Sequence, residues 1–519
     1  MSRIQLKADK KILQFARWAG VGFLFALNHS RVALYSSNET TKLFHGIASA
    51  GKGFLQSDWF YSTKDPLPAF SRFIAWSYSL FGEYVFYFYY SLLLAVYFYA
   101  VIKIFYPNTS ESENNDRWLF ATLVFIFYSR IVGEISQGLL GFDPTRILQG
   151  GVAEQNLIGP LFQNSLFGVF LVLSIPLFLE GRLILSALSI GMACTIHSAY
   201  LFGGAALTSA FMIIWVIQRK NIWKSFGFGV LTLILVLPTV ITSGSTIASG
   251  GAESVRRALE IIVIERIPHH SLPSVWLDTV SIIKVIIIIV AICLNLRKPL
   301  GWILGIPFIA GLLGTLAQVI TGNLELALIA PWRVSVFLVP LSVLSILHKI
   351  LRILGKIDEQ RSIVLVKLTC TSVIIFCTFS GIWIQTSRIL ASPNTSERRL
   401  MSYVEQTVSK DDLFMIPPRL FLLEQFRLRT GAPIIINWKS HPYGDEEVLE
   451  WYERNRSLSS FYEADSQSMA VSALREIRKK YHPTHVLIVN TAEMLNLTLK
   501  AIESTPVYVN DVYTLYQLH

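Results

Sequence analysis

The stretch EYVFYFYYSLLLAVYFYAVIKIF, Glu83 to Phe105, decides the fold class of this chain. Its charged residues, Glu83 and Lys103, stand near its two ends, and the residues between them are apolar, aromatic or small. An α-helix needs about 20 predominantly apolar residues to cross the hydrocarbon core of a bilayer. The stretch therefore predicts a membrane-spanning helix.

Apolar runs of this kind recur along most of the chain. Of the 519 residues, 52% are hydrophobic and 15% are charged, which is too apolar for an ordinary soluble protein. We expect about eleven spans, at 12–29, 83–105, 117–133, 163–180, 183–199, 200–218, 225–243, 279–296, 300–321, 332–350 and 362–386. The sequence thus predicts an α-helical polytopic membrane protein.

The pattern changes beyond residue 400. Short runs rich in branched residues, such as APIIINW and THVLIVN, alternate with segments of helical spacing, such as MAVSALREIRKKY. The final PVYVNDVYTLYQLH has the pattern of two strands around an Asn-Asp turn. We expect a transmembrane domain over residues 1–390 and a small α/β domain over residues 391–519, with a largely parallel sheet that ends in an antiparallel pair.

Lysines and arginines set the expected orientation. They fall before or at the first span and then in alternate loops, from MSRIQLKADKK to HKILRILGKIDEQR. Cytoplasmic loops carry such an excess, so we expect a multi-pass protein of the plasma (inner) membrane with a cytoplasmic N-terminus and an extracytoplasmic C-terminal domain. The same loops account for the net charge of +10 without a nucleic-acid partner. The four cysteines lie in apolar segments and form no recognisable disulfide framework or zinc site.

The first outer loop carries one candidate for proton transfer, Asp58 in LQSDWF. A partly desolvated carboxylate has a raised pKa and can take a proton from a hydroxyl group. Asp is also a favoured N-cap, so Asp58 fits the start of a helix near Trp59 as well. Farther along, the amphipathic stretch AFSRFIAWSYSLF fits a helix that lies along the membrane interface.

The second outer loop places Glu134, Asp143, Arg146 and Glu154 among several glycines. Glycines let a loop approach a ligand closely, and polar groups that enter a span usually face a cavity or a partner helix. Asp143 precedes Pro144 and therefore also fits the N-cap of a short helix. This loop is the second candidate for a functional site.

The third candidate is ERIPHHSLPSVW, Glu265 to Trp276, in which two prolines frame His269 and His270. Adjacent side chains of an extended segment point to opposite sides, so the pair is a poor chelate for one metal ion. Arg266 adds cationic donors suited to phosphate, and Arg333 in APWRVSVFLVP stands at the outer end of a later span. Packed or solvated histidines and a headgroup anchor at Arg333 are the structural alternatives.

With these features the sequence resembles the GT-C class of integral-membrane glycosyltransferases. The resemblance rests on the many spans, Asp58 in SDWF, the acidic second loop GEISQGLLGFDPTR, and the outer C-terminal domain that ends in VYVNDVYTLYQL. The order RIPHHSLPSVW, APWR and IPPRLFLLEQFRLRTGAP is also similar to that of a group of uncharacterised bacterial membrane proteins with this layout.

The resemblance implies transfer of a sugar from a lipid-linked polyprenyl phosphate or diphosphate donor to a glycan or protein acceptor on the outer face. By that analogy Asp58 is the general base, and Glu134 or Asp143 assists it or holds a divalent metal. The expected substrate-binding residues are Arg146, Arg266, His269, His270 and Arg333. The first loop lacks a paired acidic motif, because Asp58 and Asp65 are seven positions apart, so metal dependence is left open.

Two other functions remain open from the sequence. A polymerase or ligase of envelope polysaccharide that uses Arg and His, without a catalytic Asp, explains the histidines equally well. A non-enzymatic transport or assembly protein is the other alternative. A transporter needs ionisable residues at mid-membrane, and the expected spans hold almost none.

Overall fold

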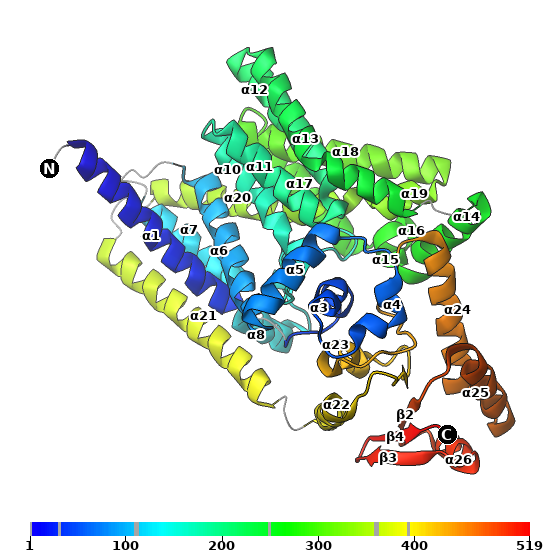
Figure 1. Ribbon diagram of the computed structural model, residues 1–519. Helices are drawn as coiled ribbons and strands as arrows, with labels where there is room; N and C mark the ends of the chain where they lie inside the picture. The colour runs from blue at the N-terminus through cyan, green and yellow to red at the C-terminus, as the bar shows by residue number, and fades with distance from the viewer. Residues whose placement is uncertain (1–2, 30–32, 108–113, 248–250, 358–362, 392–394) are drawn as a thin grey trace. The chain divides into compact units, whose positions relative to one another are not determined.

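The computed structural model describes residues 3–29, 33–107, 114–247, 251–357, 363–391 and 395–519. These residues are mostly helical, and they divide into two compact units, each made of segments that are distant in sequence (Figure 1). Unit 1 consists of Met1–Arg31, Phe86–Ile241 and Val263–Thr386, and unit 2 of Val32–Val85, Thr242–Ile262 and Ser387–His519.

Unit 1 contains the long apolar helices. Its elements are α1 (Arg3–His29), α6 (Val85–Phe105), α7 (Asn114–Phe127), α8 (Arg130–Leu140), α9 (Pro144–Gln149), α10 (Val169–Leu179), α11 (Leu183–Ile196), α12 (Leu201–Arg219), α13 (Ile222–Ile247), α15 (Pro268–Ser271), α16 (Pro273–Trp276), α17 (Thr279–Leu294), α18 (Pro299–Thr321), α19 (Leu324–Ile329), α20 (Ser335–Ile357) and α21 (Ile363–Ala391). A few of these helices, such as α13 and α21, continue past the ends of the unit.

The length and composition of these helices make the chain a multi-pass membrane protein. Six described helices can cross a membrane: Val85–Phe105, Ser198–Gln218, Ile222–Gly244, Pro299–Thr321, Leu324–Leu354 and Val364–Arg388. The pair Asn115–Phe127 and Arg130–Leu140 would make a seventh span, bent by 59° at its break. The expectation of eleven spans is not confirmed, because α10, α11 and α17 are shorter than the ~20 residues of a crossing and α1 begins with a run of charged residues.

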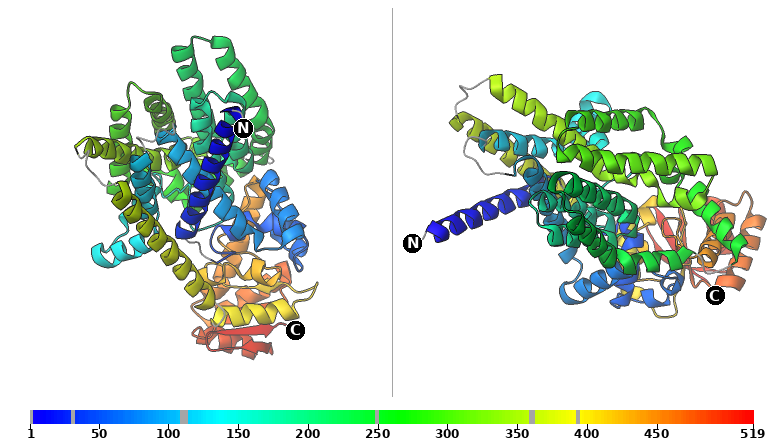
Figure 2. Two further views of the ribbon diagram at one scale, coloured as in Figure 1. Left: turned by 90° about the vertical axis from the view of Figure 1, so that its left-hand side faces the viewer. Right: turned by 90° about the horizontal axis from the view of Figure 1, so that it is seen from above.

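Helix packing in unit 1 uses small residues where helices approach closely. The helices α17, α18 and α20 pack on one another, and Figure 2 shows them among the green and yellow-green ribbons. α21 crosses α1 at Gly381, where an added Cβ would lie 2.4 Å from the carbonyl oxygen of Leu27. A side chain at this position would force the two helices apart.

Unit 2 combines short helices with one sheet. Its helices are α2 (Glu39–Lys42), α3 (Phe44–Ser49), α4 (Trp59–Ser62), α5 (Pro68–Phe81), α14 (Ala252–Glu260), α22 (Ser396–Thr407), α23 (Phe426–Thr430), α24 (Asp445–Tyr462), α25 (Gln467–Tyr481) and α26 (Glu493–Ala501). Its strands are β1 (Phe414–Met415), β2 (His485–Val489), β3 (Thr505–Val509) and β4 (Tyr513–Gln517).

The sheet has the order β1-β2-β4-β3. β3 and β4 pair antiparallel, and the side chain of Asn510 accepts hydrogen bonds from the backbone N–H groups of Val512 and Tyr513, so the predicted hairpin is confirmed. The predicted largely parallel sheet is wrong, because only β1 and β2 pair parallel. The expected strand APIIINW contributes a single bridge, from Ile434 to Phe414.

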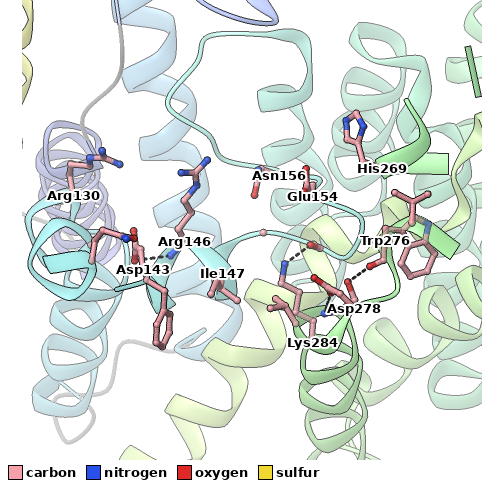
Figure 3. A pocket seen from close by; sticks show the side chains of 18 of the residues that line it. Arg130, Asp143, Arg146, Ile147, Glu154, Asn156, His269, Trp276, Asp278 and Lys284 are labelled. Atoms are coloured by element: carbon pink, nitrogen blue, oxygen red, sulfur yellow. Dashed lines mark hydrogen bonds between the residues drawn. The ribbon is translucent and has the colours of Figure 1, made fainter. Parts of the chain in front are cut away.

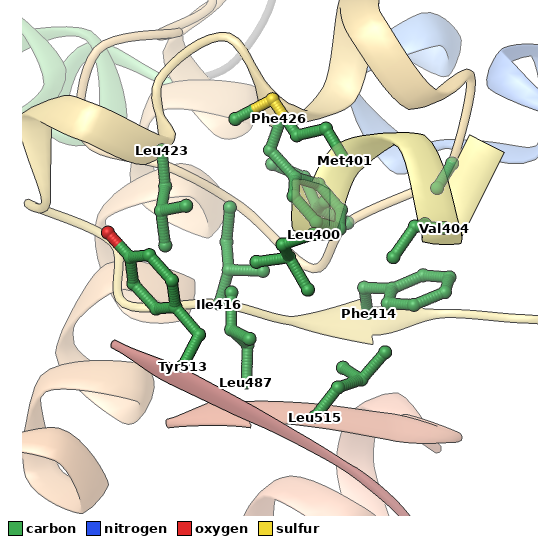
Figure 4. Close-up of a cluster of buried hydrophobic side chains, with 12 residues drawn as sticks. Leu400, Met401, Val404, Phe414, Ile416, Leu423, Phe426, Leu487, Tyr513 and Leu515 are labelled. Atoms are coloured by element: carbon green, nitrogen blue, oxygen red, sulfur yellow. The ribbon is translucent and has the colours of Figure 1, made fainter. Parts of the chain in front are cut away.

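The core of unit 2 lies between α22 and the sheet. Figure 4 shows buried side chains from α22, from the segment after β1, from α23 and from the strands converging on one cluster. The labelled members are Leu400, Met401, Val404, Phe414, Ile416, Leu423, Phe426, Leu487, Tyr513 and Leu515. These residues span more than a hundred positions, so α22 and the hairpin belong to one folded body.

Unit 2 also includes the first loop, which the expected domain over residues 391–519 does not contain. The backbone N–H of Phe54 donates to the carbonyl of Gly431 at 2.8 Å. Gly53 and Gly431 both have positive φ, and a Cβ on Gly53 would lie 2.5 Å from the carbonyl oxygen of Gly431. The two backbones therefore approach as closely as only glycine allows, and the C-terminal segment folds together with residues 33–85.

Candidate functional site

Unit 1 contains a cavity of about 760 Å³ that is rich in charged side chains. Its walls come from α8, α9, residues 150–156, and the stretch from α15 into α17 (Figure 3). The polar lining residues are Arg130, Glu134, Gln137, Asp143, Arg146, Glu154, Asn156, His269, Asp278, Ser281 and Lys284. The volume lies within the ~300–1,000 Å³ of typical small-molecule sites.

A tight turn, residues 150–156, forms one wall of this cavity. Its backbone closes on itself through a 2.7 Å hydrogen bond from the N–H of Gly151 to the carbonyl of Gln155. The Nζ of Lys284 on α17 donates to the carbonyl of Gly151 at 2.8 Å, and the Oγ of Ser335 on α20 accepts from the N–H of Val152 at 2.8 Å. Two helices distant in sequence therefore hold the turn in place.

Ala153 and Glu154, in the same turn, are consecutive non-glycine residues in the left-handed region, with φ of 59° and 53°. Each such residue costs about 1–3 kcal/mol and persists only where the surroundings impose it. Ala153 is buried, whereas Glu154 is exposed in the cavity. The carboxylate of Glu154 has no hydrogen bond or ion pair with the described residues, and its electrostatic neighbour is Lys284. The strained backbone thus presents a free carboxylate to the cavity.

Glu134 and Asp143 also line the cavity, but their carboxylates have local partners. Glu134 forms an ion pair with Arg130 one helical turn away, at 3.0 Å. Asp143 is the N-cap of α9, and its Oδ1 accepts from the N–H and hydroxyl groups of Thr145 and from the N–H of Arg146. The interpretation of Asp143 as a helix cap is confirmed. A catalytic role for either residue stays a prediction.

Arg146 supplies a cation from α9. Its side chain lines the cavity and is exposed, and it forms no hydrogen bond or ion pair with the part of the chain that the structure describes. Figure 3 shows Arg146 and Glu154 entering the cavity from different elements. A guanidinium group has the donor geometry to bind a phosphate through two hydrogen bonds.

The two histidines of the Pro-framed stretch have different surroundings, although their rings lie 4.1 Å apart. His269 lines the cavity. His270 Nδ1 lies 2.7 Å from the carbonyl oxygen of Ala153, and burial, followed by the positive charge of His269, lowers the pKa of His270 to about 3. His270 is therefore neutral at physiological pH, with Nδ1–H as the donor to Ala153, and it supports the turn.

The structure brings four of the eight predicted site residues to the cavity: Glu134, Asp143, Arg146 and His269. The other predicted residues of unit 1 lie outside its walls. Arg266 ends a π-helical segment, Ile261–Arg266. The Nε of Arg333 donates to the side-chain oxygen of Gln155 at 3.2 Å. Arg333, like His270, therefore contacts the 150–156 turn without lining the cavity. Their expected contact with phosphate stays a prediction.

Asp58 belongs to unit 2, and its side chain is only 1% exposed. Its Oδ1 accepts from the N–H of Phe60, which confirms the interpretation of Asp58 as the N-cap of α4, and from Nη1 of Arg427 at 3.2 Å. Its Oδ2 accepts from the N–H of Ile434 at 3.0 Å. The Arg427 guanidinium also stacks over Phe44, 4.1 Å from the ring centroid. These contacts are those of a buried structural ion pair, and the role of general base stays a prediction.

The sequence analysis missed several cavity residues, among them Asp278 and Lys284. Asp278 caps α17, and its Oδ1 accepts from the N–H of Ser281 at 2.7 Å. Lys284 stands alone in the apolar run SIIKVIIIIV, which is an available signal because an ionisable residue inside a span is usually functional. Among the described residues, no group of three or more His, Cys, Asp or Glu side chains is placed to hold a metal ion.

Comparisons with known proteins show similarity to a family model and to solved structures. Residues 395–458 match a family model described as a domain of unknown function, DUF6798. The fold is similar to the crystal structure of ArnT from Cupriavidus metallidurans bound to undecaprenyl phosphate, with a TM-score of 0.43 and 12% identity over 98% of each chain. A similarity of this size does not establish a shared function. A search of curated proteins found no match.

Asp58→Asn tests whether the buried ion pair is structural. The amide oxygen can still cap α4, but the charge of Arg427 then lies buried without a counter-ion. We expect the free energy of unfolding, measured in detergent, to fall by about 3–5 kcal/mol. Combining Asp58→Asn with Arg427→Met removes both charges and should recover most of the loss. An Asp58→Asn variant that is as stable as the wild type but inactive would instead identify Asp58 as a base.

The low pKa of His270 predicts a pH dependence of stability. The unfolded chain binds a proton at His270 near pH 6.5, whereas the folded chain does so only near pH 3. The stabilisation is therefore complete above pH 6.5 and is lost, by at most about 1.4 kcal/mol per pH unit, as the pH falls toward 3. His270→Asn retains a donor without titrating, so its melting temperature should fall less steeply between pH 6.5 and 5. Equal slopes for the two proteins would contradict this assignment.

Proposed function

We propose that the chain is an integral-membrane glycosyltransferase that moves a sugar from a polyprenyl-phosphate-type donor to an acceptor on the outer face of the membrane. The cavity of unit 1 is the proposed site. One observation carries the proposal: the cavity contains a carboxylate, Glu154, and a guanidinium, Arg146, that are both free of protein partners within the described residues. The donor class comes from the resemblance of the sequence to GT-C enzymes.

The proposed reaction uses Glu154 as the general base. Its carboxylate takes the proton of the acceptor hydroxyl group as the acceptor oxygen attacks the anomeric carbon of the donor. A new bond forms between this carbon and the acceptor oxygen, and the bond between the carbon and the phosphate oxygen breaks. Glu154 suits this role because its backbone is held in the left-handed region and its side chain lines the cavity.

Arg146 and Lys284 stabilise the leaving phosphate in this proposal. Negative charge grows on the phosphate as the glycosyl bond breaks, and preorganised cations favour that transition state over the ground state. Lys284 uses one of its three N–H bonds on the carbonyl of Gly151, so two remain for a ligand. His269, at the edge of the same cavity, is a further donor.

The alternative that relies on arginine and histidine alone receives less support from the site. His270 is neutral, and it is occupied by the carbonyl of Ala153. Arg333 is bonded to Gln155. In the proposal these two residues position the turn that carries Glu154, and they do not contact the donor.

Glu154→Gln is the direct test of the proposed base. The variant keeps the size and polarity of the side chain but cannot accept a proton, so we expect sugar transfer in reconstituted membranes to fall about 10²–10⁴-fold. Its melting temperature should change little, because Glu154 has no hydrogen bond or ion pair to lose within the described residues. Glu325→Gln on α19, an exposed glutamate outside the cavity walls, is the matched control and should retain full activity. Full activity of Glu154→Gln would exclude it as the base.

Arg146 variants test the phosphate contact. Removal of a hydrogen-bonded charge costs about 1.5–3 kcal/mol, so Arg146→Ala should weaken binding of the lipid-linked donor about 10- to 100-fold. Arg146→Lys keeps the charge but not the two-pronged geometry, and should show an intermediate loss. Donor titrations that measure KM and kcat separate these cases. A wild-type KM for Arg146→Ala would place the phosphate elsewhere.

A further inference from the structure

Helix α5 in unit 2 has one buried and one exposed face. Its boundaries follow from the sequence, since Pro68 occupies the first turn and Gly82, with φ of 69°, ends the helix. Phe70 and Ile74 are fully buried, and α5 packs against α3. The contact with α3 accounts for the buried face of α5.

The opposite face is apolar and aromatic, yet it is exposed. Trp76 is 58% exposed, Leu80 57%, Phe81 60% and Tyr84, just beyond the helix, 76%. The rings of Trp76 and Phe81 meet edge to face with centroids 6.2 Å apart, so they form a continuous patch. Arg72 is exposed one turn before Trp76. Exposed patches of this kind, in contrast to scattered single residues, mark contact surfaces.

The short connection between α5 and the membrane-spanning helix α6 indicates what covers this patch. Only three residues, Gly82, Glu83 and Tyr84, separate the end of α5 from Val85, where the membrane-spanning helix α6 begins. The four Cα–Cα steps from Phe81 to Val85 extend over at most about 14 Å. The end of α5 therefore lies within about 14 Å of the first residue of the membrane-spanning helix α6, which keeps it near the membrane interface.

We propose that the exposed face of α5 binds the lipid surface and anchors unit 2 to the membrane. Trp and Tyr concentrate at membrane interfaces, where an apolar ring with a polar edge fits the headgroup region. Leu80 and Phe81 enter the acyl boundary in this arrangement, and Arg72 contacts lipid phosphates. The first loop and the C-terminal segment fold as one unit, so one short helix holds both at the membrane.

A fluorescent probe at position 79 tests this surface in the full chain. Ser79 is exposed on α5, and Ser472 on α25 is an exposed polar position for comparison. Each is changed to Cys in a chain whose four native cysteines are replaced by alanine, labelled with a polarity-sensitive dye, and reconstituted in phosphatidylcholine nanodiscs with or without brominated acyl chains. We expect the probe at 79 to show blue-shifted emission, several-fold weaker quenching by aqueous iodide than the probe at 472, and quenching by brominated lipid.

Two results would overturn the proposal. Equal iodide quenching at 79 and 472 would show that the face is open to water. Protection of position 79 from both iodide and brominated lipid would show that protein, such as a second copy of this chain, covers it. Trp76→Ser, Leu80→Ser and Phe81→Ser, combined with Ser79→Cys, should restore iodide access, because these exposed side chains supply the membrane contact and not the fold.

Discussion

Two backbone carbonyls, those of Gly151 and Ala153, hold the candidate site together. Each lies in the 150–156 turn and is bonded by a side chain more than one hundred positions away, Lys284 and His270 respectively. Without these contacts a left-handed Ala-Glu pair has no reason to persist, because a non-glycine residue gains nothing locally from that conformation. The direction of the Glu154 side chain is therefore a property of unit 1 as a whole.

The magnitudes are consistent with this dependence. Two left-handed residues cost about 2–6 kcal/mol together. A hydrogen bond from a charged donor contributes about 1.5–3 kcal/mol, and a neutral one about 1. Lys284 and Arg333 are charged donors to the turn, and His270 and Ser335 are neutral partners. These four contacts together contribute about 5–8 kcal/mol, which offsets the strain, and loss of Lys284 or Arg333 removes more of this stabilisation than loss of His270 or Ser335. Removal of a supporting residue should therefore let the backbone of Glu154 leave the left-handed region, and its carboxylate would then be displaced from the site.

The sequence predicts local features well and long-range ones poorly. Asp58 and Asp143 as helix caps, and the C-terminal hairpin at Asn510, depend on residues within three positions of one another, and all are found. The contact of Asp58 with Arg427, 369 positions apart, was not predicted. No periodicity in the sequence predicts that a first-loop carboxylate pairs with an arginine near the C-terminus, so the ion pair of Asp58 is found only in the structure.

Lys284 shows a different kind of failure. The sequence does show it, as a single charge in an apolar run. The mean hydropathy of the expected eighteen-residue span hides it, because one lysine changes that mean very little. The positive φ of Glu154 has no such signal, because left-handed backbone is expected at glycine, and the two glycines of the 150–156 turn, Gly150 and Gly151, precede Glu154.

These contacts give the two units different features. In unit 2 the buried Asp58–Arg427 pair and the Gly53–Gly431 approach join the first loop to the DUF6798-matching segment, so neither segment has a complete core alone. In unit 1 the charged cavity is lined by α8, α9, residues 150–156 and the stretch from α15 into α17. The carboxylate of Asp58 accepts from Phe60, Arg427 and Ile434, whereas that of Glu154 has no hydrogen bond or ion pair within the described residues and is open to a ligand. The proposed function therefore assigns the chemistry to Glu154 in unit 1, and the Asp58→Asn variant decides whether Asp58 in unit 2 acts through its ion pair alone.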